Sequence, residues 1–176
     1  MEKLRFPIGQ YSPPEKITME HIAKWIDELE NFADLLRTEI SGLSDEQLDT
    51  PYRAEGWTIR QVVHHLPDSH VNSYTRFRLA LTENVPTIKT YNEALFAELP
   101  DAKTAPVDLS LNLLDALHKR WAALLRSMSE ADFKKEYIHP EFEERIVLGW
   151  NIGLYAWHCR HHMMQIRALK KRKGWA

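Results

Sequence analysis

Cysteine is nearly absent from this chain of 176 residues, which contains only Cys159. A single cysteine excludes any disulfide within the chain, so disulfide-stapled fold classes are ruled out. Scarce cysteine is typical of proteins that live in a reducing compartment. The length is ordinary for one domain and sufficient to bury a sizeable core, so we expect residues 1–176 to form a single domain.

Long apolar runs are also missing. No stretch approaches the ~20 consecutive apolar residues that a membrane-spanning helix requires. The first residues, Met1 to Pro7, lack the apolar segment of a secretory signal peptide. We therefore expect a soluble, cytoplasmic protein with no membrane partner.

Neither sign of charge is in large excess. The formal net charge is -2 and the isoelectric point is near 6.5, so the composition gives no electrostatic reason to expect a nucleic-acid partner. The chain has only 6 glycines against 9 prolines, which argues against collagenous or linker-rich sequence. The run of cations from Lys170 to Lys173 suits the negative end of a helix dipole.

Apolar residues recur at steps of three and four in four long segments, which is typical of amphipathic helices. These segments span about residues 18–41, 58–80, 108–128 and 148–173. Thr18 and Thr58 suit helix N-caps, and Gln61 stands at the capping-box position after Thr58. The sequence therefore predicts an all-α four-helix bundle.

The segments between the helices shape this expectation. Prolines and a glycine in residues 1–17 predict an extended N-terminal arm. Residues 84–107 form a long connection between the second and third long helices, with room for one short helix at 91–99. Residues 137–147 have weak strand character and suit a small hairpin or an irregular loop.

Histidine is the enriched component, with 9 in the chain. His158 and His162 are four residues apart on an expected helix, so both imidazoles face the same way and could share one metal ion. This spacing is weak evidence by itself, because random placement would give about half such a pair. Solvated or satisfied core histidines are the commoner explanation.

A second histidine stretch strengthens the metal hypothesis. His64 and His65 lie in the middle of the second long helix, and His65 follows Val62 by three residues, near the buried stripe. A buried imidazole needs polar partners. Three histidines from two bundle helices could satisfy one another through a cation, and bundle cores are common places for such sites.

Several motifs resemble the DinB-like family of four-helix-bundle metalloproteins, and within it the YfiT-type group of metal-dependent hydrolases. The resemblance covers nearly the whole chain. It is carried by Phe6-Pro7-Ile8-Gly9, Gln47 to Arg53, Gly56-Trp57-Thr58 with His64-His65-Leu66, Asp68-Ser69-His70 with Asn72-Ser73-Tyr74, Gly153-Leu154-Tyr155 and Trp157-His158.

The resemblance implies a ligand set and a function. In the family one histidine of the second helix and the HxxxH pair of the last helix bind the metal, which implies His65, His158 and His162 here. It also implies a homodimer and a metal-dependent hydrolase, while some members are S-transferases that use low-molecular-weight thiols such as bacillithiol. Two departures stand out: Pro67 replaces an expected helix former, and Gln165 stands where relatives can carry another histidine.

Three histidines leave an open coordination position, which is typical of catalytic rather than structural sites. Such a site suits one divalent ion per chain, zinc first and nickel second, because imidazole binds both. It could activate water or hold a small thiolate against a small electrophilic substrate, so hydrolase, thiol transferase and non-catalytic metal-binding stress protein all stay open. Asp68 is the candidate catalytic residue, three positions after His65, although it could equally cap the backbone that Pro67 frees.

The other histidines and the cysteine have less specific expectations. His64 and His161 adjoin the implied ligands and should point elsewhere, and Cys159 should face about 100° away from His158. His70 is a candidate to line the pocket. We expect the remaining three histidines at the surface or at helix edges: His21, His118 and His139.

Overall fold

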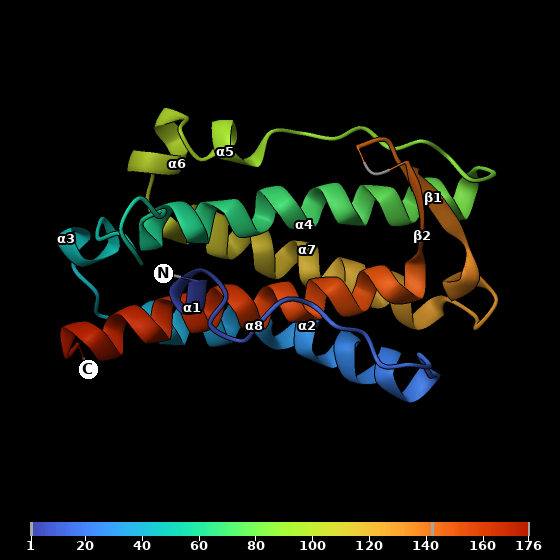
Figure 1. Cartoon of the computed structure of the whole chain (residues 1–176), viewed down its shortest axis with the longest axis horizontal. Coiled ribbons are helices and arrows are strands. Elements are labelled where there is room, and N and C mark those ends of the chain that lie inside the picture. The colour runs from blue at the N-terminus through green and yellow to red at the C-terminus, as the bar shows by residue number, and fades with distance from the viewer. Residues whose placement is uncertain (1, 142, 176) are drawn as a thin grey trace.

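The fold is built from four long helices packed side by side (Figure 1). They are α2 (Met19–Ile40), α4 (Ile59–Thr82), α7 (Val107–Ser127) and α8 (Leu148–Lys173). The computed structural model describes residues 2–141 and 143–175, so residues 1, 142 and 176 of the expected domain lie outside the description. The expected four-helix bundle is confirmed.

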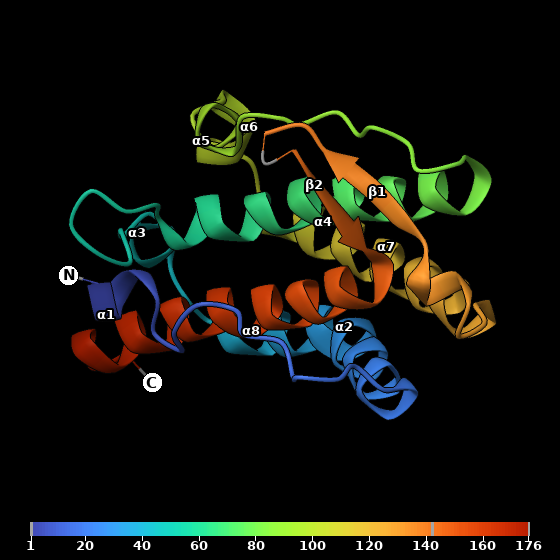
Figure 2. The same cartoon turned by 45° about the vertical axis from the view of Figure 1, so that its right-hand side comes forward.

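Each long helix has two bundle neighbours. α2 packs against α7 and α8, and α4 packs against the same two helices, so α2 and α4 occupy opposite corners (Figures 1 and 2). The chain therefore crosses a diagonal between its first two long helices. As a result α8, the last helix, lies between the first two.

The capping residues predicted from the sequence are confirmed. Thr18 and Thr58 each accept a hydrogen bond from the backbone N–H three residues later, and the side chains of His21 and Gln61 return the contact. Such reciprocal caps satisfy N–H groups that a helix start otherwise leaves unpaired. The cap at Thr58 fixes the start of α4 about two turns before His65.

The core is one cluster of apolar side chains between the four helices. The largest fully buried side chains include Trp121 of α7, Phe77 of α4 and Leu29 of α2. The buried residues of α2 recur at the three- and four-residue steps that predicted this helix. None of the described helices combines the length and the apolar character that a bilayer crossing needs.

Shorter helices and one hairpin lie before and between the four long helices. They are α1 (Glu2–Arg5), α3 (Asp45–Leu48), α5 (Glu93–Phe96), α6 (Pro100–Thr104), a 3₁₀ turn (Asp132–Lys134) and the antiparallel hairpin of β1 (Glu136–His139) with β2 (Glu144–Val147). The hairpin alternative for residues 137–147 is thus the correct one. The long connection carries two short helices, α5 and α6, rather than one.

The N-terminal arm departs from expectation at its start. Glu2–Arg5 forms one helical turn, α1, which packs against α8. The prolines and glycine that motivated an extended arm all lie after this turn, so they do not oppose it. The rest of the arm, residues 6–17, forms neither helix nor strand, as expected, and it runs along α8 (Figure 2).

Candidate metal centre

The interface between α4 and α8 carries buried polar pairs in place of an apolar seam. Asn151 donates a hydrogen bond from Nδ2 to Ser73 Oγ, 3.0 Å away. One turn further along α8, the Tyr155 hydroxyl donates to the backbone carbonyl of Ser69 over 3.3 Å. The next turn of α8 brings in His158, so the polar seam leads directly to the histidines.

Three imidazoles meet there through their Nε2 atoms. His65 of α4 and His158 of α8 place these atoms 3.3 Å apart, and those of His158 and His162 are 3.1 Å apart. Each residue offers a ligand atom within 4.8 Å of the other two. Zinc–nitrogen bonds of about 2.0–2.1 Å at a tetrahedral angle would separate two ligand nitrogens by about 3.3–3.4 Å.

The donor chemistry also fits a cation. A neutral imidazole has one N–H, so a proton on His158 Nε2 could be donated to only one of its two Nε2 neighbours, and the other close contact would lack a hydrogen bond. Burial lowers the pKa of His65 to about 4 and the pKa values of His158 and His162 well below 6.5. The three rings are therefore neutral at pH 7, as metal ligands must be.

Two neighbours orient the ligand rings. Nδ1 of His162 lies 2.8 Å from Gln165 Oε1, an acceptor, which fixes the proton of this ring on Nδ1. Nδ1 of His158 lies 3.1 Å from His70 Nε2. Both contacts leave the Nε2 lone pairs free to face an ion, which is the usual arrangement around histidine ligands.

A cavity of about 410 Å³ opens over the three histidines. Its walls carry two arginines, Arg5 and Arg53, and two glutamates, Glu55 and Glu93. Aromatic surface comes from Phe6, Tyr52, Trp57 and Trp157. The ligand nitrogens thus face a space that a small molecule could enter, with charges of both signs around it.

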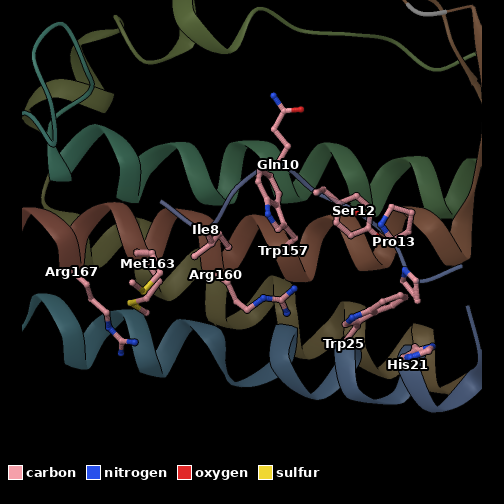
Figure 3. A pocket seen from close by; sticks show the side chains of 13 residues that line it. Ile8, Gln10, Ser12, Pro13, His21, Trp25, Trp157, Arg160, Met163 and Arg167 are labelled. Atoms are coloured by element: carbon pink, nitrogen blue, oxygen red, sulfur yellow. The ribbon is translucent and has the colours of Figure 1, made fainter. Parts of the chain in front are cut away.

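A larger cavity, of about 870 Å³, lies beneath the N-terminal arm (Figure 3). It is bounded by the arm, by Trp25 and His21 of α2, and by one face of α8. None of the three converging histidines lines it, and Trp157 separates the two spaces by contributing to both. The cavity of about 410 Å³ is therefore the one that reaches the three converging histidines, although it is the smaller of the two.

The other candidate residues lie outside the three-histidine cluster. His64 contacts Ser110 Oγ at 2.6 Å and the Ala105 carbonyl at 3.1 Å, so it faces the connection to α7. His161 stacks on Trp157 and lines the cavity wall. Asp68 is half-buried, and burial together with Asp101 raises its pKa to about 6, but it is not part of the cavity wall.

Two departures from the family pattern now have a structural reading. α4 continues through Pro67, and the ring is buried in the helix that carries His65. Gln165 accepts the Nδ1 proton of His162. Its amide nitrogen donates to His161 Nε2 and to the Arg5 carbonyl, so it also ties the arm to the site.

Sequence reasoning missed a second buried cluster, made of His70, His118 and Cys159. His118 was expected at the surface or at a helix edge but is fully buried. Cys159, which was expected to face away from His158, lies close to the rings of His70 and His118. A signal was present, since His118 follows Leu114 by four residues and precedes Trp121 by three, on the inner stripe of its helix.

Comparisons with known proteins agree with this architecture. The model of the DinB superfamily matches residues 28–166. A protein of Bacillus mycoides named "putative metal-dependent hydrolase" is 55% identical over 175 residues, covering 99% of this chain and 100% of the relative. One of Bacillus licheniformis with the same description is 51% identical over 175 residues, covering 99% of both.

A solved structure is similar along the same length. It is YfiT from Bacillus subtilis, described as "a probable metal-dependent hydrolase with an unusual four-helix bundle topology". The TM-score is 0.97 at 49% sequence identity, and the match covers 99% of each chain. The diagonal crossing between α2 and α4 is therefore a shared arrangement of the fold.

Proposed function

The chain belongs to the DinB superfamily, and we propose that it is a metal-dependent hydrolase whose ion is held by His65, His158 and His162. The observation that carries the proposal is the convergence of three Nε2 atoms, 3.1 and 3.3 Å apart, beneath a cavity. The description shared by relatives of 51–55% identity supports the hydrolase reading.

We propose one divalent ion per chain, and zinc in preference to nickel. Three imidazoles with a fourth position left open form the usual ligand pattern of catalytic zinc. Imidazole also suits nickel, which generally binds nitrogen ligands comparably well, so the preference concerns geometry rather than affinity. Elemental analysis of protein purified without added metal decides between the two ions.

The chain itself contributes ligand orientation, neutral donors and a shaped cavity. A bound ion would lower the pKa of coordinated water towards 7, or hold a thiolate in the same position. Gln165 and His70 contact the Nδ1 atoms of two ligand rings, and aromatic side chains form part of the cavity wall. The volume of about 410 Å³ restricts the substrate to a small molecule.

The proton acceptor for hydrolysis must come from the cavity wall. In the described part of the chain, the hydrogen bonds of the three histidines lead to histidine and glutamine side chains, and none leads to a carboxylate. Glu55 and Glu93 are the carboxylates in the wall. We propose them, in place of Asp68, as candidates to accept the proton of the attacking water.

The direct test is hydrolysis of a panel of small amides and esters by zinc-loaded protein. Wild type and Asp68→Asn should cleave at similar rates, His158→Ala should lose metal and activity together, and Glu55→Gln or Glu93→Gln should lose rate while keeping zinc. Equal cleavage by wild type and His158→Ala would contradict the proposal.

Thiol transfer is the second candidate, favoured because no ligand histidine is hydrogen-bonded to a carboxylate among residues 2–141 and 143–175. A thiolate needs no strong general base once a cation stabilises it. The same protein is offered an electrophilic bimane with glutathione, cysteine or bacillithiol. Zinc-dependent conjugation without hydrolysis in the panel would replace the hydrolase proposal by a transferase.

A further inference from the structure

We propose that His70 and His118, two histidines outside the ligand set, fix the tautomer and orientation of the ligand His158 through a hydrogen-bonded chain that ends on His118 of α7. The inference rests on the metal site proposed above. It assigns both residues a positioning role, since neither faces the cavity.

The chain of contacts joins three of the four long helices. Nδ1 of His158 on α8 lies 3.1 Å from Nε2 of His70 on α4. Nδ1 of His70 lies 2.8 Å from Nε2 of His118 on α7. The chain of hydrogen bonds ends at His118, whose Nδ1 is buried with no hydrogen-bond partner among the described residues.

The ligand end of the chain sets the proton placement. His158 presents Nε2 to the Nε2 atoms of His65 and His162, so a metal held there requires a lone pair on this atom. The single proton of the neutral His158 ring must then lie on Nδ1, the atom that faces His70.

One proton placement then follows for every ring. With Nδ1 protonated, His118 offers the Nε2 lone pair to the Nδ1–H of His70. His70 in turn offers its Nε2 lone pair to the Nδ1–H of His158. The last ring is left with an Nε2 lone pair, and this is the atom that faces His65 and His162. The reverse placement would protonate Nε2 of His158 and block the metal.

The surroundings keep these hydrogen bonds dry. His70 and His118 have no exposed surface. Tyr155 stands edge-on to the His70 ring at 4.9 Å between centroids, and Phe32 lies 6.2 Å from the ring of His118. Burial lowers the pKa of His118 to about 3, so this ring stays neutral and carries a single proton. Because water does not reach this neutral ring, its hydrogen bonds within the protein determine the tautomer.

A second metal site is the competing reading of the same residues. His70, His118 and Cys159 each offer a ligand atom within 4.8 Å of the others. Binding there would break the contact between the two histidines, and it would require a thiolate although burial raises the pKa of Cys159 well above its ordinary value. The hydrogen-bonded chain uses both ring nitrogens of His70 as placed, so we assign the two histidines to it.

The first test measures the zinc dissociation constant by chelator competition near pH 7.5. His70→Leu and His118→Leu should raise the constant about 10- to 100-fold, as loss of groups that orient ligands does elsewhere. His70→Gln and His118→Gln should recover most of the loss, because an amide can accept from one neighbour and donate to the other. Cys159→Ala is the matched control and should bind zinc as wild type does.

The second test reads the tautomers themselves by nitrogen NMR of histidine-labelled protein. His70 and His118 should show protonated Nδ1 with and without zinc, and His158 should show it in the zinc-loaded protein. This readout stays decisive if a leucine variant fails to fold, which circular dichroism would reveal. The NMR readout also separates the inference from the proposed function. A wild-type protein that binds no zinc would refute the metal site, whereas the tautomers of His70 and His118 can be read without zinc.

Three results would overturn the inference. Protonated Nε2 on His70 or His118 would show the opposite proton placement. Unchanged zinc affinity in folded His118→Leu would show that the chain does not act on His158. Two zinc ions per chain, with one lost in Cys159→Ala, would assign the cluster to a second metal site.

Discussion

Acid should unfold the metal-free protein well before it titrates the surface carboxylates, because buried neutral histidines must gain protons on unfolding. Burial lowers the pKa of His118 to about 3 and that of His65 to about 4, whereas an exposed imidazole titrates near 6.5. Between these values the unfolded state binds more protons than the folded state. The free energy of unfolding therefore falls as the pH drops from about 6.5 towards 4.

The magnitude follows from the width of this interval. Lowering the pH from 7 to 5 should cost about 2 kcal/mol for each such ring, since one pKa unit corresponds to about 1.4 kcal/mol. His65 and His118 together then remove about 4 kcal/mol, a large part of the 5–15 kcal/mol that typical domains have. Zinc should oppose this loss until its ligands are protonated.

Urea unfolding of zinc-free protein at several pH values between 5 and 7 measures the effect. In His118→Leu the slope of unfolding free energy against pH should decrease by about 1.4 kcal/mol per unit, because one titrating group is gone. Leu117→Ala, at the neighbouring core position, should lower stability without changing the slope. An unchanged slope in His118→Leu would refute the assignment of this ring as buried and neutral.

Two further predictions concern α8. Gln165→Leu removes the acceptor for His162 Nδ1 and should weaken zinc binding about 10- to 100-fold, whereas Gln165→Glu keeps the acceptor and should preserve binding in the same chelator assay. Gly153→Ala would place a methyl group 2.2 Å from the Tyr11 hydroxyl and 2.9 Å from the Trp25 ring. The substitution should lower the free energy of unfolding by about 1–3 kcal/mol in urea. Full wild-type stability would show that the N-terminal arm can move away from the added methyl group at little cost.

The helices could be predicted because local rules determine them. The recurrence of Trp25, Leu29 and Phe32 on one face of α2, and the reciprocal caps at Thr18 and Thr58, depend on residues within a few positions. The hairpin was open between two readings, since its pairing depends on contacts with the connection. Ile88, for example, donates its backbone N–H to the Ile138 carbonyl.

The polar interior could not be predicted in full. The spacing of His158 and His162 is visible in the sequence, but the contact of His70 with His118 joins residues 48 positions apart on different helices. Helical periodicity places His118 on an inner stripe without naming its partner. The same limit applies to Asp68. Its spacing from His65 suggested that it lies close to the metal site, but the carboxylates in the cavity wall are Glu55 and Glu93, which come from other segments of the chain.

The most direct measurement is the zinc content of five single variants purified under the same conditions. His65→Ala, His158→Ala and His162→Ala should each release the ion, because each supplies one of three Nε2 ligands. His64→Ala and His161→Ala should retain about one ion per chain, since their rings face other partners. Retention of zinc in the first three variants, or its loss from His64→Ala with retention in His65→Ala, would contradict the three-histidine centre.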